Sequence, residues 1–251
     1  MRHFFELLAI MTKREPIARY KNTLFGFLWV VVNPLIQTFV IGFVFRFFVK
    51  EPMQNYYLYL LVGLLVWNFF SLSLSKATPS IVNERNLIKK ARFESEVIPI
   101  SIVLANSIHL VFAILIILIP ILAGKIITPN NLPNLVIGVI LLLVFATGIS
   151  LLTSALNVQY RDINFFVQAA LVVWFYATPI VYPIHVIPRS LIWIWRLNPM
   201  TSITQLFQNA LVSAPAPGIG MFTLNFLIIV TITVLGILVF KKQAKNFDDW
   251  V

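Results

Sequence analysis

The sequence has no cysteine, and only 11% of its 251 residues are charged. Without cysteine, the chain can form neither a disulfide framework nor a thiolate metal site. The charged share is about half that of an ordinary soluble domain, which leaves too little polar surface to cover a fold in water. Hydrophobic residues make up 59% of the chain, so the composition predicts an integral membrane protein.

Catalytic motifs are missing as well. No Gly-rich phosphate loop ends in Gly-Lys-Ser or Gly-Lys-Thr, so we expect no ATP hydrolysis by this chain alone and no enzyme activity. The histidines His3, His109 and His185 lie far apart, so we expect neither a metal site nor a cofactor. For His109, which falls in an apolar run, a helix–helix hydrogen bond and a polar substrate or proton contact are the two alternatives.

Six apolar runs have about the ~20 residues that a helix needs to cross a bilayer. They cover residues 24–48, 57–81, 97–119, 135–157, 163–182 and 220–240. The second run is the least uniform, since Ser71, Ser73, Ser75, Lys76 and Thr78 must face protein, water or the membrane surface. No acidic residue falls within the runs, which disfavours an ion-driven transporter. We expect an all-α integral membrane protein with six transmembrane helices in a single domain, 1–251.

The basic residues indicate how these helices are oriented. A net charge of +10 can indicate a nucleic-acid partner. Here the Lys and Arg residues lie between the apolar runs, so membrane topology explains them and no nucleic acid is expected. With a cytoplasmic N-terminus, most of the 19 basic residues face the cytoplasm, which places the tail 241–251 there too. The cytoplasmic set is Arg2, Lys13, Arg14, Arg19, Lys21, Arg85, Lys89, Lys90, Arg92, Arg161, Lys241, Lys242 and Lys245.

Residues 1–22 precede the first run and are amphipathic. Phe4, Leu7, Leu8 and Met11 recur at helical spacing among charged residues. This pattern predicts a helix that lies along the inner membrane surface. A frayed, charged N-terminus is the alternative.

Residues 183–217 separate the fifth run from the sixth and contain several prolines among apolar side chains. The segment is too broken to span a membrane and too apolar for a free loop. We expect two short re-entrant helices on the outer side, whose backbone must be satisfied by protein or water. The alternative is an interfacial helix anchored by Trp193 and Trp195.

The charged segment between the second and third runs contains two apolar residues. A short helix that begins after Asn83 would expose Leu87 and Ile88 among charges, which is typical of docking into a groove on a partner. A basic hairpin that serves only topology is the alternative. The predicted coupling segment consists of Glu84, Arg85, Asn86, Leu87, Ile88, Lys89 and Lys90.

Over nearly its whole length the chain resembles the membrane subunit of type-2 ABC exporters of the polysaccharide-export branch. Four motifs, in this order and spacing, produce the resemblance. They are Arg19-Tyr20-Lys21-Asn22-Thr23-Leu24-Phe25-Gly26 with Trp29, Asn33 and Pro34; Asn83 to Lys90 with Phe93 and Pro99; Tyr160-Arg161-Asp162-Ile163; and Thr178-Pro179-Ile180-Val181-Tyr182-Pro183 with Asn198-Pro199. Glu94 departs from the pattern, because relatives commonly have proline after the Phe.

The resemblance implies a homodimer that encloses a channel in the inner membrane of a bacterium. Each copy would bind one soluble ATPase subunit through residues 84–90, and ATP and Mg²⁺ would be held by that partner. The exported molecule would be a glycan on a lipid-diphosphate carrier, most often an O antigen, with capsule and teichoic acid as close alternatives. A drug or lipid exporter of the same fold, a passive channel and a polytopic lipid-linked sugar transferase are the remaining classes.

Candidate substrate contacts follow from the chemistry of such a glycan. Sugar rings present C–H faces and hydroxyls, which suit aromatic side chains with polar neighbours; packing against lipid or other helices is the alternative for each aromatic residue. The candidates for the substrate path are Tyr20, Phe25, Trp29, Trp174, Phe175, Tyr176, Tyr182, Trp193 and Trp195. For the diphosphate of the carrier they are Arg14, Arg19 and Lys21, with attraction to anionic membrane lipids as the alternative.

Overall fold

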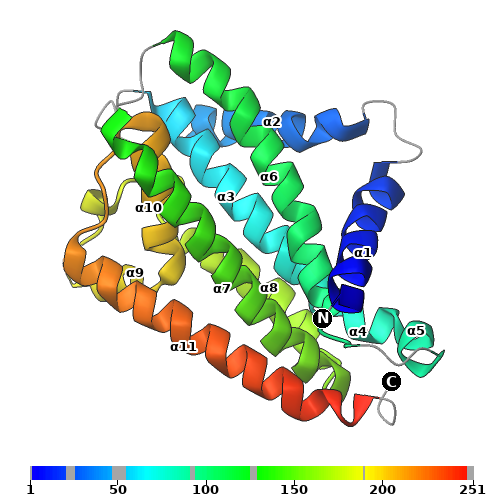
Figure 1. The fold of residues 1–251 in the computed structure, drawn as a ribbon. Coiled ribbons are helices and arrows are strands. Elements are labelled where there is room, and N and C mark those ends of the chain that lie inside the picture. Colours follow the sequence, from blue (N-terminus) through cyan, green and yellow to red (C-terminus); the bar gives the residue numbers. More distant parts are fainter. Residues whose placement is uncertain are drawn as a thin grey trace.

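The structure, a computed structural model, describes residues 2–20, 26–46, 55–90, 94–124, 129–188 and 190–247. Every regular element in these ranges is a helix. Figure 1 shows long helices packed side by side as a bundle, with shorter helices at its two ends. The predicted class, an all-α integral membrane protein, is confirmed.

Among the described residues, four helices are long and apolar enough to cross a membrane: α3 (Tyr56–Ala77), α6 (Val97–Ala123), α7 (Leu132–Gln159) and α11 (Ile219–Ala244). The shortest of them, α3, has 22 residues, about 33 Å at 1.5 Å per residue, which matches the ~30 Å hydrocarbon core. Two further apolar helices, α2 (Trp29–Arg46) and α8 (Asp162–Tyr176), are shorter. Each of the six predicted runs therefore contains an apolar helix. The fifth ends earlier than expected, and in the first the described α-helix begins at Trp29, after the 3₁₀ turn η1 (Gly26–Leu28).

The end of α8 explains why the fifth helix is short. The sequence predicts a span up to residue 182, but the helix ends at Tyr176. Pro179 disfavours a helical conformation in the residue before it and has no N–H to donate. The last carbonyls of α8 find other donors: Thr178 Oγ1 donates to the Trp174 carbonyl at 2.8 Å and Asn198 Nδ2 to the Ala177 carbonyl at 2.8 Å.

Helix α3 lies at the centre of the bundle and contacts α2, α6, α7 and α8. Most of its side chains are buried, and the Phe70 ring stacks on Phe145 of α7 with 5.4 Å between centroids. Two polar residues near the end of α3 are buried and bonded. Asn106 Nδ2 donates to Ser73 Oγ at 3.1 Å, and Oγ1 of Thr78, which directly follows the helix, donates to the Leu74 carbonyl at 2.8 Å. These hydroxyls face protein, as the sequence requires.

Helices α7 and α11 cross at two glycines. A Cβ atom built on Gly236 would lie 2.1 Å from the Gly148 carbonyl oxygen, and one built on Gly148 would lie 2.5 Å from Thr233 Cα. The backbones therefore touch, and no larger residue fits at this crossing.

At one end of the bundle, α1 (Arg2–Tyr20) packs against α6 close to α4 (Ser80–Asn83) and α5 (Arg85–Lys90) (Figure 1). The predicted apolar stripe of this N-terminal helix lies in a cluster of buried side chains rather than facing outward. The cluster contains Met11, Ile81, Ile88, Val97 and Ile98, with Phe4, Leu7 and Leu8 packed against it. The outward-facing apolar residues are Phe5, Ile10 and Ile17.

The segment 183–217 forms two short α-helices, α9 (Ile192–Leu197) and α10 (Pro199–Val212), after the 3₁₀ turn η3 (Ile184–Val186). Nearly every residue of α10 is buried between α3 and α7, although many are polar. The protein therefore surrounds this helix. Its depth in the membrane stays a prediction.

Candidate functional site

A cavity of about 1010 Å³, here called the central groove, lies between α2, α3, α6 and α8. Its volume is at the upper end of the range of about 300–1,000 Å³ for small-molecule sites. Trp29, Phe175 and Tyr176, three of the predicted substrate-path residues, line it. The structure thus brings together aromatic residues from α2 and α8 that lie far apart in the sequence.

Polar side chains make up much of the remaining lining. Asn68 Nδ2 of α3 donates to Gln37 Oε1 of α2 at 3.0 Å, so the two walls are joined inside the groove. Amides and hydroxyls of this kind donate to and accept from sugar hydroxyls. The polar residues of the lining are Asn33, Gln37, Asn68, Ser71, Ser75, Lys76, Asn106, His109 and Gln168.

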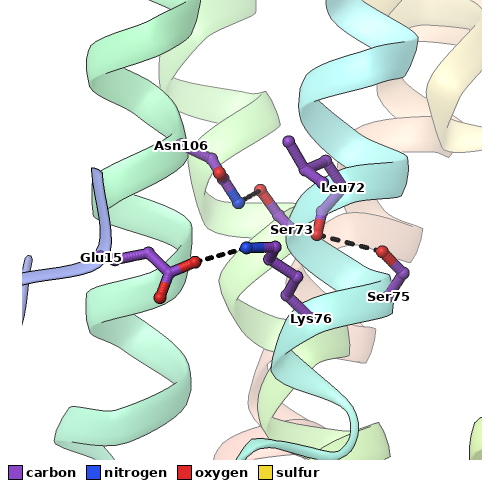
Figure 2. Close-up of polar contacts among 6 residues, drawn as sticks. All are labelled: Glu15, Leu72, Ser73, Ser75, Lys76 and Asn106. Atoms are coloured by element: carbon purple, nitrogen blue, oxygen red, sulfur yellow. Dashed lines mark hydrogen bonds and ion pairs between the residues drawn. The ribbon is translucent and has the colours of Figure 1, made fainter. Parts of the chain in front are cut away.

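Lys76 lies where α3 approaches α4, and its ammonium group is ion-paired. Its Nζ lies 2.6 Å from Glu15 Oε1, a carboxylate contributed by α1 (Figure 2). One turn away, Asn106 of α6 is bonded to Ser73 of α3, so polar contacts connect three helices at this level. A lysine at the end of an apolar helix needs a partner or water, and the Glu15 carboxylate supplies the partner.

Four other substrate-path candidates lie outside the groove. The Trp174 ring packs on Phe70 with 5.2 Å between centroids, and its Nε1 donates to Asn198 Oδ1 at 2.8 Å. Trp195 Nε1 donates to the Tyr182 hydroxyl at 2.9 Å, and Trp193 is exposed on α9. The side chain of Tyr20 and the whole of Phe25 lie outside the described residues.

The predicted coupling segment forms α5, and Glu84 lies between it and α4. Arg85, Asn86 and Lys89 are exposed. The expectation that both apolar residues are exposed is wrong for Ile88, which is buried in the cluster beside Met11 and Val97, while Leu87 is half-buried. The apolar side of α5 attaches this helix to the bundle, because Ile88 belongs to the same buried cluster as residues of α1 and α6. The side chain of Lys90 lies outside the described residues.

Of the three candidates for binding the lipid diphosphate, Arg14 is described. Its Nη1 lies 3.4 Å from Glu84 Oε1, so it connects α1 to the start of α5. The side chain of Arg19 and the whole of Lys21 lie outside the described residues. Two adjacent residues of α1 therefore contact two different segments. Arg14 contacts the coupling segment, and Glu15 contacts the end of α3.

The sequence also contains a pattern of polar residues that indicates the groove independently of the aromatic candidates. Asn33 and Gln37 are four residues apart in α2, and Ser71 and Ser75 are four apart in α3. This spacing puts each pair on one face of its helix. Within a membrane span such a polar face must meet protein or water. Among the described residues, no cluster of three His, Asp or Glu side chains could hold a metal ion.

The chain is similar to known membrane transport proteins over most of its length. The chain matches the ABC-2 type transporter family over residues 6–212. It is 30% identical to the O-antigen export system permease protein RfbA of Klebsiella pneumoniae over 256 aligned positions, which cover 98% of this chain and 95% of the relative. The protein of the same name from Myxococcus xanthus is 32% identical over 80% of this chain and 78% of its own length.

A third relative is the polysialic acid transport protein KpsM of Escherichia coli, which is 24% identical over 92% of this chain and 91% of its own length. The family match covers most of the chain, and the Klebsiella relative aligns with it nearly from end to end. The chain therefore belongs to the ABC-2 type transporter family.

Proposed function

We propose that this chain is the membrane subunit of an ATP-driven exporter of a lipid-linked polysaccharide, with O antigen as the first candidate. The observation that carries the proposal is the lining of the central groove, which combines amides, hydroxyls and the aromatic rings of Trp29, Phe175 and Tyr176. Amides suit sugar hydroxyls, and aromatic faces suit the C–H faces of sugar rings. The names of the full-length relatives support the same substrate class.

The energy comes from a separate ATPase subunit that binds ATP and Mg²⁺ and docks on α5. The exposed residues Arg85, Asn86 and Lys89 form the docking surface. The link from α5 to the groove is short, because the Glu84 N–H donates to the Ser80 carbonyl at 3.0 Å and α4 follows directly on α3. A push on α5 therefore moves α3, which forms one wall of the groove. Two copies of the chain form the channel, each with one ATPase, and both termini lie in the cytoplasm of a bacterium.

Capsular polysaccharide is the second candidate substrate, and the KpsM relative supports it. Teichoic acid is a further candidate within the same substrate class. The cargo of a drug or small-lipid exporter of this fold fits the groove less well, because it offers few hydrogen-bonding groups to the amides of the lining. These are Asn33, Gln37, Asn68 and Gln168.

The test is to delete the gene in the bacterium that encodes this chain. We expect surface polysaccharide to disappear while lipid-linked polysaccharide accumulates inside the cell, as measured by immunoblotting of whole cells and of spheroplast extracts. Expression of the wild-type chain should restore the surface material. Unchanged surface polysaccharide after deletion would rule out the proposed function. Antibodies against O antigen and against capsule show which of the two polysaccharides is lost.

A further inference from the structure

Among the described residues that line the central groove, Lys76 alone carries a full charge. Its side chain is 37% exposed, so the ammonium group remains reachable although Glu15 is bound to it. The nearby lining consists of Ser71, Ser75 and Asn106, which are neutral. The groove therefore offers one cationic position next to a neutral polar wall.

The carboxylate that occupies this position comes from outside the groove. Glu15 belongs to α1, none of whose described side chains lines the groove, and its side chain is 29% exposed. The Nζ–Oε1 distance of 2.6 Å is that of a direct charge-assisted hydrogen bond (Figure 2). An ion pair this exposed is weak, because water competes with both partners. A second anion that enters along the groove can therefore compete with Glu15 for the same lysine.

A phosphate group is the anion that best fits the surroundings. Beside the groove, α2 exposes the large apolar residues Ile36, Phe39 and Phe43, which suit a lipid chain. The groove itself suits sugars, and Lys76 lies at its charged end. A molecule with an apolar tail, phosphate groups and a sugar chain matches all three features.

We propose that Lys76 binds the phosphate groups of the lipid-linked substrate and that Glu15 occupies this lysine while the substrate is absent. Phosphate binding then breaks the Glu15–Lys76 bond between α1 and α3, while α1 stays packed against α6. This inference rests on the proposed function, because it names the residue that recognises the phosphate-bearing end of the exported glycolipid.

The proposal predicts opposite effects for the two partners of the ion pair. Glu15→Gln removes the competing carboxylate. It should tighten phosphate binding about fivefold, because the free energy of an exposed ion pair corresponds to a change in affinity of about that size. Lys76→Gln removes the phosphate ligand and should weaken binding about tenfold. If the pair served only to hold the fold together, both changes would act in the same direction.

The experiment measures binding of undecaprenyl diphosphate to the purified full-length chain in nanodiscs, by quenching of tryptophan fluorescence. Trp29 and Trp67 line the groove and report on its occupancy. Lys76→Arg keeps the cation and should retain binding. Lys13→Gln, which removes an exposed lysine of α1, is the matched control and should leave binding unchanged. Size-exclusion chromatography of each variant confirms that it is folded.

Two lipids identify the source of the phosphate. Undecaprenol, which has no phosphate, should not compete with undecaprenyl diphosphate, and phosphatidylglycerol at equal concentration should compete at least tenfold less well. Equal competition by phosphatidylglycerol would overturn the proposal in favour of a general anionic-lipid site. The proposal would also be overturned if Glu15→Gln and Lys76→Gln weakened binding of undecaprenyl diphosphate equally. The same holds if neither the wild type nor Glu15→Gln bound this lipid. The deletion phenotype tests the exporter function independently of these results.

Discussion

Single residues connect segments of the chain that lie apart in the sequence, and Asn198 is the clearest case. Its Oδ1 accepts from the Met200 N–H at 3.0 Å and so caps α10, and it also accepts from Trp174 Nε1 at 2.8 Å. Its Nδ2 donates to the Ala177 carbonyl and to Thr178 Oγ1. One buried amide therefore holds the start of α10 to the end of α8.

Replacing this amide should destabilise the protein. We expect Asn198→Ala to lower the free energy of unfolding by about 2–4 kcal/mol, because it removes a helix cap and leaves buried partners without their bonds. The measurement is thermal unfolding in detergent followed by circular dichroism. Asn246→Ala, at an exposed asparagine near the C-terminal end of α11, is the control. Equal melting temperatures for the two variants would show that Asn198 has no such role.

At the scale of helices, the crossing of α7 and α11 depends on the absence of side chains. We expect Gly236→Ala to lower the free energy of unfolding by about 1–3 kcal/mol, because its methyl group would overlap the Gly148 carbonyl. Gly220 lies on the same helix with open space around its Cβ position. Gly220→Ala should therefore leave stability unchanged or raise it slightly. Denaturation of both variants in SDS measures the difference, and the reverse order of stability would refute the close crossing.

Helix α5 packs one face against the bundle and exposes the other, which we propose binds the ATPase. The double charge reversal Arg85→Glu/Lys89→Glu changes only exposed residues, so we expect a folded chain that no longer co-purifies with its ATPase. Lys245→Glu, an exposed charge reversal near the C-terminal end of α11, should keep the ATPase bound. The readout is affinity purification of the co-expressed pair. Normal recovery of the ATPase with the double variant would move the docking surface away from α5.

Ile88 does not serve as a test of docking. Its side chain is 7% exposed and packs among Met11, Val97 and Ile98. A charged residue there would be buried without a partner, so loss of the ATPase would follow from misfolding rather than from a lost contact. The sequence around Ile88 predicts the short helix, but it does not show which face of that helix packs against the bundle.

At the scale of the whole molecule, the sequence predicts the class and the positions of the apolar helices well, because bilayer thickness sets their length. It predicts short helices within residues 183–217, but it does not predict that Thr201, Ser202 and Gln208 of α10 are buried. Polar side chains of this kind are indistinguishable in sequence from those of a surface helix, and only the surrounding helices decide. The sequence predicts Trp29, Phe175 and Tyr176 of the groove but not the polar part of its lining, since four helices must pack before Asn33, Asn68 and Gln168 share a surface.

At the same scale, helix α1 connects α5 with α3, which forms one wall of the groove. Helix α1 contacts the end of α3 through Glu15 and the start of α5 through Arg14. A movement of α5 therefore reaches both α1 and α3. This arrangement provides a physical route from the proposed ATPase docking site on α5 to the central groove.

Transport by the reconstituted complex tests this account most directly. The chain and its ATPase are placed in proteoliposomes with lipid-linked polysaccharide, and the glycan that reaches the opposite leaflet is measured with an impermeant lectin. We predict ATP-dependent transport by the wild type and a loss of about tenfold or more in Asn33→Leu/Gln168→Leu, which removes two groove amides. Gln159→Leu, at an exposed glutamine outside the groove, should transport normally. No ATP-dependent transport by the wild type, or equal transport by both variants, would contradict the account.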